Sequence, residues 1–307
     1  MKLRAVKILQ SLRKVRLFLR LNKLLIIPPD ANEILSIKQA STQLILDHLI
    51  HGAQDTFSSE PAILKDIYFE TKISGPVSFN IQDKVHLLFL KSHVNDFLCD
   101  ILRKFSSPNT AFLDIGSNIG FYSWFYQAMG ENHTVFVFEP NPSLIPHLEI
   151  NLKKNNTHIF GIALSDETST VQLFFDENST GRGSLERDYF TNSVKVNTDR
   201  LDNVINIQQE KFSKYIIKVD VEEHEPKVLR GMLNWLGDTR PKLIYLEARP
   251  QTIDEICEIL FHHNFFLLTQ NLEILFGREL DNFLARVKDQ KYTNIVFSNS
   301  IQDFLHY

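Results

Sequence analysis

The sequence predicts an α/β fold with a doubly wound, mostly parallel sheet, preceded by an N-terminal extension. From residue 110 onward, short apolar runs alternate with helical patterns, which is typical of parallel sheets with crossover helices. A glycine-containing turn, within FLDIGSNIGFYS, directly follows the first of these runs. Two later apolar runs end in acidic residues, at the edge where such sheets bind ligands.

Composition and charge set the broad class. The 307 residues are 43% hydrophobic, enough for one large core with an appendage or for two small domains. The net charge is -4, yet residues 1–29 carry eight Lys and Arg and no acid. This asymmetry predicts a basic tail on an acidic body, for which nucleic acid is an unlikely partner.

Cysteine use and hydropathy suggest the compartment. Cys99 and Cys257 are far apart and lack any metal-ligand spacing, so we expect inert thiols and no disulfide framework. No run is long and apolar enough to span a membrane, and basic residues interrupt any signal-like stretch near the N-terminus. We therefore expect a cytoplasmic protein, either soluble or peripheral at a membrane.

Residues 1–109 are expected to form the extension and residues 110–307 the ligand-binding domain. Residues 1–27 show a helical apolar stripe among basic residues. Such a helix could lie on an anionic membrane surface, or pack on its own domain or a partner. Pro28 and Pro29 end it. Residues 30–65 also have a helical pattern, and IYFETKI and VSFNI read as strands separated by a turn.

Within the second domain, each element follows from its periodicity and flanking turn residues. Strands are expected at 111–116, 134–140, 157–165, 171–175, 215–222 and 241–248. Helices are expected at 93–105, 121–130, 143–155, 226–236 and 252–264. Residues 193–202 read as an inserted loop. The last two strands, 265–269 and 294–299, are expected to pair antiparallel, because too little chain separates them for helical crossovers.

The turn after the first strand indicates the kind of ligand. Asp114 precedes it, and Gly116 and Gly120 allow close backbone approach. A GxGxxG dinucleotide fingerprint is absent, because its central glycine has no counterpart. An acid beside the loop would also repel a diphosphate. It suits a cationic, phosphate-free ligand such as S-adenosylmethionine, although a purely structural turn is the alternative.

The next two strand ends extend this interpretation. Glu139 lies 23 residues after Gly116, where an acid accepts ribose hydroxyls, although acids are also favoured at helix N-termini. Ser165 and Asp166 follow the third strand and could hold an adenine amino group. They could equally form a simple turn.

The segment IIKVDVEEHEPKVLRG carries the fourth group of polar residues. In a doubly wound sheet, this strand lies beside the first at the switch point, so Asp220 would face the reactive end of the ligand. We assign Asp220, Glu222 and His224 to the site. For Glu223 and Glu225, stabilisation of the following helix N-terminus is the preferred role.

The ordered motifs FLDIGSNIGFYS, VFVFEPNP, ALSD, IIKVDVEEHEPKVLRG and LIYLEARP resemble the FkbM family of S-adenosylmethionine-dependent methyltransferases. The resemblance covers about residues 110–270. It implies a class I methyltransferase fold, Rossmann-like and with an antiparallel last strand. It also implies O-methylation of a hydroxyl on a sugar, glycoconjugate or secondary metabolite.

Specific residues follow from the resemblance. The cofactor-binding positions it implies are Asp114, Gly116, Asn118, Gly120, Glu139 and Asp166. Asp220, Glu222 and Glu225 match a DVEGxE segment, in which this chain has Glu223 instead of glycine. If that glycine makes room for substrate, Glu223 alters the pocket. If it only provides a turn, the change is mild.

The mechanism expected is in-line displacement, in which a positioned base takes the acceptor hydroxyl proton. Asp220 or His224 is the expected base, with Glu222 orienting the acceptor. Loop 178–188 is either a lid or a solvated loop. Metal assistance by Asp220, Glu222 and His224 lacks supporting ligand spacing, so no metal is expected. The other functions considered are RNA or protein methylation and a non-catalytic, membrane-associated scaffold.

Overall fold

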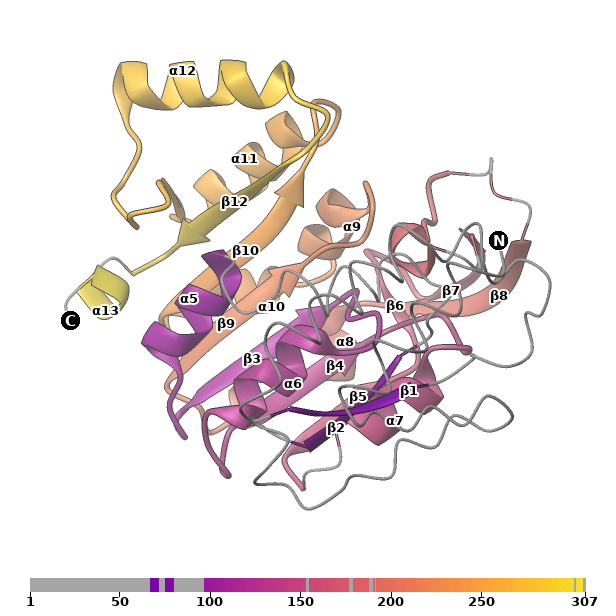
Figure 1. Ribbon diagram of the computed structural model, residues 1–307. Helices are drawn as coiled ribbons and strands as arrows, with labels where there is room; N and C mark the ends of the chain where they lie inside the picture. The colour runs from indigo at the N-terminus through magenta and orange to yellow at the C-terminus, as the bar shows by residue number, and fades with distance from the viewer. Residues whose placement is uncertain are drawn as a thin grey trace, which may run out of the picture. The chain divides into compact units, whose positions relative to one another are not determined.

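The computed structural model describes residues 67–71, 75–79, 97–152, 155–176, 179–187, 190, 192–300 and 302–305 (Figure 1). The chain divides into two compact units. The first comprises Met1–Val94 and Glu177–Gly181, and the second comprises Asn95–Asp176 and Arg182–Tyr307. The helices expected at 1–27 and 30–65 lie outside the described residues, so they and the membrane contact stay predictions.

In the first unit, the structure describes a two-stranded antiparallel hairpin. β1 (Ile67–Thr71) pairs with β2 (Gly75–Phe79), with Ile67 opposite Phe79. Both expected strands are therefore present. None of the helices in the described part of the chain is both long and apolar enough to cross a membrane.

The second unit is built on a seven-stranded sheet with the order β11–β12–β10–β9–β3–β4–β5. Its strands are β3 (Thr110–Ile115), β4 (Thr134–Phe138), β5 (Thr157–Phe160), β9 (Lys214–Val219), β10 (Lys242–Ala248), β11 (Phe266–Leu268) and β12 (Thr293–Ser298). Strands β10 to β5 pair in parallel, and β12 is antiparallel to both neighbours. The doubly wound sheet with an antiparallel last strand is thus confirmed.

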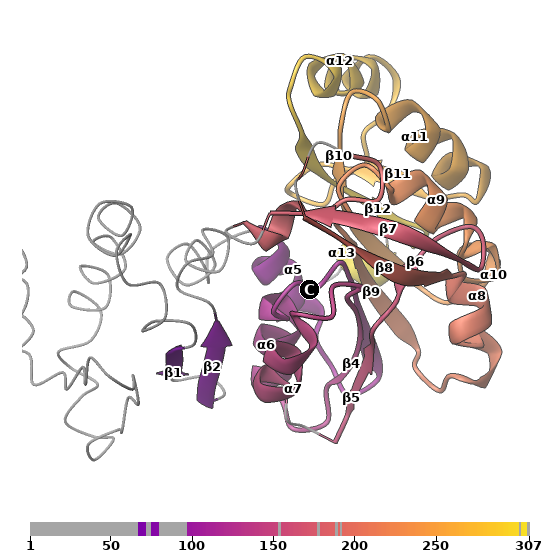
Figure 2. The same ribbon diagram turned by 90° about the vertical axis from the view of Figure 1, so that its right-hand side faces the viewer.

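Helices cover both faces of this sheet (Figure 2). On one side lie α5 (Phe97–Phe105), α6 (Phe121–Ala128) and α7 (Ile145–Asn151). On the other lie α9 (Glu225–Arg230), α10 (Leu233–Gly237) and α11 (Ile253–His262). Alternate strand residues face the two layers: Phe112 packs against Tyr126 of α6 at 5.5 Å between ring centroids, whereas Leu113 joins a core with Leu229 and Leu260.

A second, three-stranded sheet lies beside the first. It consists of β6 (Ala163–Leu164), β8 (Asn192–Asp199) and β7 (Ser169–Phe175), in that order. The run 157–165, expected as one strand, is split: β5 ends at Phe160 and β6 pairs with β8 instead. Residues expected as a loop at 193–202 form most of β8, because Val194 and Val196 pack with the β7 side chains.

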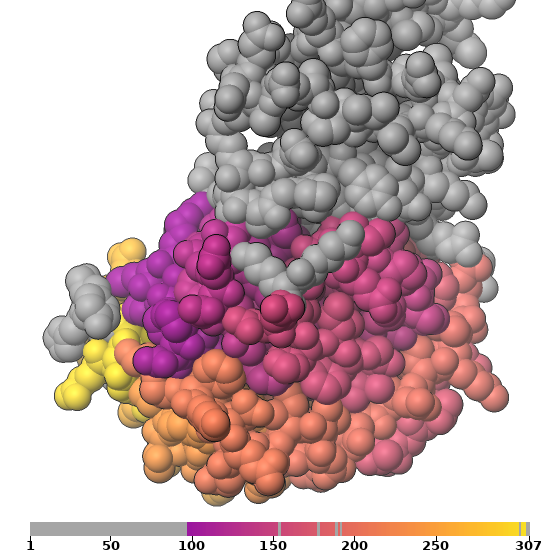
Figure 3. All heavy atoms as spheres, turned by 90° about the horizontal axis from the view of Figure 1, so that it is seen from below, coloured from indigo at the N-terminus to yellow at the C-terminus, as the bar shows by residue number. Residues whose placement is uncertain are grey.

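Two helices complete the unit. α12 (Gly277–Lys288) separates β11 from β12 and was not predicted, because its apolar face is narrow: Leu280, Phe283 and Leu284 are only partly buried. The antiparallel pairing expected for the two strands is nevertheless confirmed. α13 (Gln302–Leu305) lies beside α5, and Figure 3 shows the yellow C-terminal part of the chain next to the purple residues of α5. Phe304 of α13 contacts Phe105 of α5 at 5.0 Å between ring centroids.

Short helical turns fill the remaining connections. They are η1 (Thr180–Arg182), α8 (Leu201–Val204) and η2 (Ile207–Gln209). The helix expected at 226–236 is divided into α9 and α10 around Gly231. Cys99 and Cys257 are buried free thiols, and burial raises the pKa of Cys257 to about 12. Burial of both side chains agrees with the inert thiols that were expected.

Candidate active site

The carboxyl ends of β3, β4, β9 and β10 meet at one edge of the sheet. Asp114 is the penultimate residue of β3 and Asp220 directly follows β9, while Glu139 directly follows β4. The chain winds away from β3 in opposite directions toward β4 and β9, so this edge contains the topological switch point. Ligands of open α/β sheets bind in this place.

The β3–α6 turn is held between the two neighbouring strands. The backbone amides of Gly116 and Ser117 both donate to the Phe138 carbonyl, at 3.0 and 3.1 Å. Gly116 and Gly120 have φ angles of 75° and 76°, in the left-handed region that favours glycine. A Cβ atom on Gly116 would lie 2.0 Å from the Asp220 carbonyl oxygen. The glycine is therefore required by close packing of the turn against the end of β9.

Replacing Gly116 by Ala is expected to lower the free energy of unfolding by about 2–5 kcal/mol, because the new methyl group meets backbone and φ is positive. Chemical denaturation measures this. Gly237→Ala is the control, since none of the residues that the structure describes lies within 4 Å of the position that its new methyl group would take, at the end of a helix. Equal stability of the two variants would contradict the packing argument.

Asp114 is fully buried and is linked to the turn by its neighbours. Its Oδ2 accepts a hydrogen bond from Ser123 Oγ at 2.7 Å, and Lys218 Nζ lies 3.5 Å from its Oδ1. Lys218 also donates to the Gly116 carbonyl at 2.8 Å and lies 3.5 Å from Asp220 Oδ2. Burial works against the ammonium charge, but the two carboxylates outweigh it and raise the pKa of Lys218. A buried cation therefore joins two of the expected site residues.

Glu139 receives two backbone hydrogen bonds. The amides of Asn118 and Asn141 donate to Oε2 and Oε1, at 2.8 and 2.9 Å. Burial raises the pKa of Glu139 to about 7, although these amides oppose the shift. Each carboxylate oxygen retains a further lone pair, so the oriented group remains able to accept hydroxyl donors.

The turn has features that fit S-adenosylmethionine. Ser117 Oγ is buried without a hydrogen-bond partner among the described residues, and Asp114 Oδ1 has an ion pair with Lys218 but no hydrogen bond there, so the turn has polar capacity left for a ligand. Gly116 packs the turn against the end of β9, and Glu139 lies at the end of the adjacent strand β4. Asp114 and Glu139 contribute negative charge, which suits a cationic ligand without phosphate.

Asp220 is the most open of the acids at this edge. Its side chain is 41% exposed, whereas that of Glu222 is 12% exposed. Glu222 Oε2 lies between Arg187 Nη1 at 2.8 Å and Arg249 Nη2 at 2.7 Å. Burial and the Asp220 charge raise the pKa of Glu222, and the two arginines oppose this. Asp220 thus faces outward while Glu222 is held in place.

Glu223 occupies a left-handed backbone position. Its φ is 82°, and that of Glu222 is 54°, so the chain turns sharply between β9 and α9. Its Oε1 accepts a hydrogen bond from Arg187 Nη2 at 2.9 Å. Positive φ is the conformation that glycine favours, which gives a backbone reason for the glycine of the FkbM motif. That glycine was explained either by space for substrate or by the need for a turn, and the geometry favours the turn.

Glu225 stabilises this turn through hydrogen bonds to its backbone. It is fully buried, and its Oε1 accepts hydrogen bonds from the amides of Val221 and Glu223 at 3.1 and 3.3 Å. Burial raises the pKa of Glu225 to about 8, and that of Glu247 nearby to about 7. Both carboxyl groups therefore stay protonated to a higher pH in the folded protein than in the unfolded chain.

The pH dependence of stability follows from the sign of these shifts. A carboxyl group whose pKa is raised on folding stabilises most below its unfolded pKa, and this contribution is lost as pH rises to the folded value. Glu225→Gln is therefore expected to match wild type near pH 4.5 and to exceed its stability above pH 8, by on the order of 4 kcal/mol. Denaturation from pH 4.5 to 9 measures the difference. An unchanged difference across that range would contradict the burial effect.

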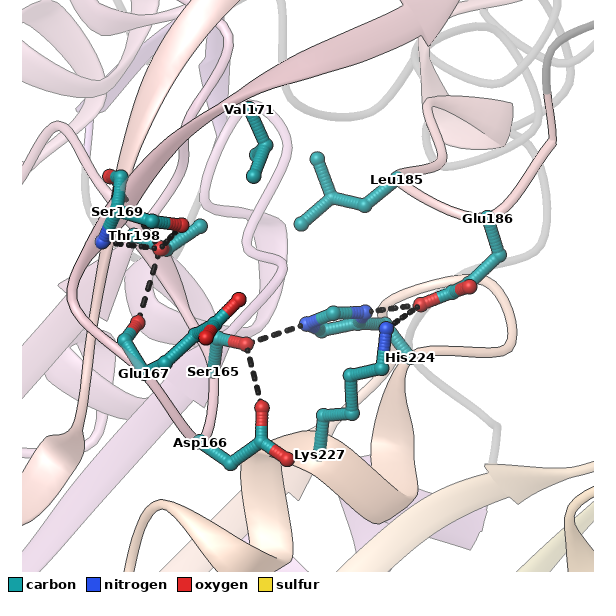
Figure 4. Close-up of a pocket in the computed structure, with 10 residues that line it drawn as sticks. All are labelled: Ser165, Asp166, Glu167, Ser169, Val171, Leu185, Glu186, Thr198, His224 and Lys227. Carbon is teal, nitrogen blue, oxygen red and sulfur yellow. Dashed lines mark hydrogen bonds and ion pairs between the residues drawn. The ribbon is translucent and has the colours of Figure 1, made fainter.

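Asp166 and His224 both line a pocket of about 400 Å³ (Figure 4). His224 Nδ1 is 2.6 Å from Glu186 Oε1, and its Nε2 is 3.0 Å from Ser165 Oγ. Burial lowers the pKa of His224, although the Glu186 carboxylate opposes the shift. Both ring nitrogens of His224 have these partners, so neither nitrogen is directed toward Asp220.

Asp166 is also engaged. Its Oδ2 accepts from Arg230 Nε at 2.9 Å and its Oδ1 from Ser165 Oγ at 3.2 Å. The pocket is further lined by Lys227 and by the apolar side chains of Val171 and Leu185 (Figure 4). The structure thus separates the expected residues into a sheet-edge group around Asp114, Glu139 and Asp220, and a pocket group.

The segment Ser184–Arg187 lies against the β9–α9 turn. Ser184 Oγ donates to the Glu222 carbonyl at 2.8 Å, and Arg187 pairs with Glu222 and Glu223. This part of the loop considered at 178–188 is consequently not a simple solvated loop. In the part of the chain that the structure describes, no group of three or more His, Cys, Asp or Glu is arranged to hold a metal.

Sequence reasoning assigned no role to Lys218, Arg187 or Arg249. Lys218 lies two residues before Asp220, and residues two apart in a strand lie on the same face, so this spacing could have identified Lys218 as a site residue. Arg249 directly follows β10, at the functional edge of the sheet. Arg187 had no local signal, because only the tertiary contact with Glu222 and Glu223 shows its place.

The strand order and the acids at the carboxyl edge define the class of S-adenosylmethionine-dependent methyltransferases with a class I fold. The family model of the methyltransferase FkbM domain matches residues 114–273, just over half of the chain. The chain therefore belongs to the FkbM methyltransferase family, as the sequence motifs indicated.

A curated relative and two solved structures add detail. The chain is 25% identical over 167 residues to the hexuronic acid methyltransferase AglP of Haloferax volcanii, a match covering 54% of this chain and 62% of that protein. It resembles fibrillarin of Aeropyrum pernix bound to S-adenosyl-L-methionine (TM-score 0.37, 12% identity, 81% and 86% coverage). It also resembles a TehB-like methyltransferase of Corynebacterium glutamicum, with a TM-score of 0.38 and 12% identity, and the match covers 68% of this chain and 91% of that chain. The match to the relative spans less than two thirds of that protein's length.

Proposed function

We propose that this protein transfers the methyl group of S-adenosylmethionine to a hydroxyl group of a sugar or glycoconjugate. The observation that carries the proposal is the alignment of Asp114, Glu139 and Asp220 at the switch point of the sheet. Family membership supports methyl transfer. The name of the Haloferax volcanii relative supports a sugar acceptor.

When bound, S-adenosylmethionine supplies a methyl group activated on a sulfonium centre. Glu139 would accept the ribose hydroxyls, and Asp114 with Ser117 would bind the amino-acid end. Asp166, held by Arg230 and Ser165, would lie on the adenine side. The turn would bring the ligand against the end of β9, because Gly116 packs directly against the Asp220 backbone.

Asp220 would accept the proton of the acceptor hydroxyl. Its carboxylate is accessible, and Lys218 lies 3.5 Å from its Oδ2 and orients it. Glu222 would orient the acceptor, since Arg187 and Arg249 hold its carboxylate in place. We assign His224 a positioning role through Ser165 and Glu186, because both of its ring nitrogens have partners.

Cofactor binding tests the proposal most directly. S-adenosylmethionine or S-adenosylhomocysteine at about 100 times its Kd should stabilise the folded protein by about 2.7 kcal/mol and raise Tm by several degrees. Glu139→Gln should reduce the shift, because an amide is a poorer acceptor for two hydroxyls. Glu131→Gln, at an exposed position in the loop before β4, is the control. Absence of any shift in the wild type would favour the non-catalytic scaffold.

A further inference from the structure

Three residues form a row across adjacent strand ends. Glu222 follows β9, Arg249 directly follows β10, and Tyr292 directly precedes β12. Because Ala248 pairs with Thr293, Arg249 and Tyr292 lie next to each other. Arg249 Nη2 is 2.7 Å from Glu222 Oε2, and its guanidinium carbon is 5.5 Å from the centroid of the Tyr292 ring. The row continues the edge that carries Asp220.

Exposure differs sharply along this row. Arg249 and Glu222 have side chains only 9% and 12% exposed, whereas Tyr292 is 50% exposed. Arg249 lies over the Tyr292 ring and restricts its orientation by a cation–π contact. A half-exposed aromatic ring with restricted orientation, beside buried charged groups, has the composition of a ligand-binding surface.

The chemistry of this row fits a sugar ring. A pyranose has an apolar face of C–H groups and hydroxyls around its rim. An aromatic ring covers the apolar face, while carboxylate oxygens accept the hydroxyl protons and guanidinium groups donate to the hydroxyl oxygens. Tyr292 provides the ring, and Glu222, Glu223 and Arg249 provide the polar groups beside it.

We propose that Tyr292 binds the acceptor, by stacking against its pyranose ring at the sheet edge that carries Asp220. The assignment of that sugar as methyl acceptor rests on the proposed function. Binding of the sugar itself does not, and it is measured separately. The stacked ring sets acceptor affinity rather than the methyl-transfer step.

The test uses the full chain and two probes, methyl α-glucuronide and methyl α-glucoside, titrated by ligand-observed NMR. Tyr292→Ala should weaken binding of the preferred probe by about tenfold, and Tyr292→Phe should retain it. In turnover assays, Tyr292→Ala should raise the acceptor KM and change kcat little. Phe276→Ala is the control, because this residue is 71% exposed and precedes the N-terminal end of α12, a helix about 18 Å long, whereas Tyr292 follows its C-terminal end.

Two outcomes would overturn the proposal: equal probe binding by wild type and Tyr292→Ala, or no binding of either probe by the wild type. The S-adenosylmethionine thermal shift is recorded on the same samples. A missing shift would defeat the proposed methyl transfer but leave the sugar-binding result interpretable. A normal shift without sugar binding would defeat the Tyr292 assignment alone.

Discussion

Asp220→Asn is expected to lower kcat by about 100- to 10,000-fold while cofactor binding persists. The amide keeps the shape of the side chain but is a far weaker base, so the hydroxyl proton has no acceptor. Asp220 also lies 3.5 Å from the buried Lys218, so the substitution should lower folding stability, but less than loss of Lys218 itself, because Asp114 still pairs with the ammonium. The measurement is methyl transfer from labelled S-adenosylmethionine to the sugar probe that wild type accepts, together with the cofactor thermal shift.

The control for Asp220 is Asp254→Asn, since the Asp254 side chain is 71% exposed and pairs with Lys288 at the surface. His224→Ala, measured in parallel, separates the two candidate bases. A smaller loss for His224→Ala than for Asp220→Asn is expected, because His224 contacts Ser165 and Glu186. Near-normal kcat for Asp220→Asn would rule out this carboxylate as the base.

Lys218→Met is expected to destabilise the fold by about 3–5 kcal/mol, the typical cost of leaving a buried charge without its partner. Lys218 is 3% exposed and pairs with the fully buried Asp114. Loss of Lys218 also removes the hydrogen bond to the Gly116 carbonyl, so the β3–α6 turn should become less rigid. Chemical denaturation measures the stability, and the cofactor thermal shift reports on the turn.

A double-mutant cycle tests whether loss of the Lys218–Asp114 pair causes this destabilisation. Adding Asp114→Asn to Lys218→Met removes the unpaired charge, so the double variant should be less destabilised than the sum of the two single variants. Lys288→Met is the matched control, because Lys288 is 47% exposed and its ion pair lies at the surface. Additive effects in the cycle would show that Lys218 and Asp114 do not stabilise each other.

Much of the fold followed from local sequence patterns. The apolar runs around Leu113, Phe136, Ile217 and Ile244 became parallel strands, because continuous apolar runs between helical segments suit strands buried on both faces. The β3–α6 turn was recognisable because Gly116 and Gly120 have φ angles that favour glycine. β8 and α12 were missed, since only packing against β7 and α11 selects their structure.

Local sequence patterns were enough to predict the parallel strands, their winding and the positions of the acids at the carboxyl edge, because strand ends and turns depend on neighbouring residues. The environments of those acids differ because of contacts with distant parts of the chain. Asp114 and Asp220 share Lys218, whereas His224 turns toward Ser165 and Glu186. Arg187, Arg249 and Tyr292 reach the same edge from distant segments. Burial and contact between residues far apart in the chain create these differences, and no local pattern encodes them.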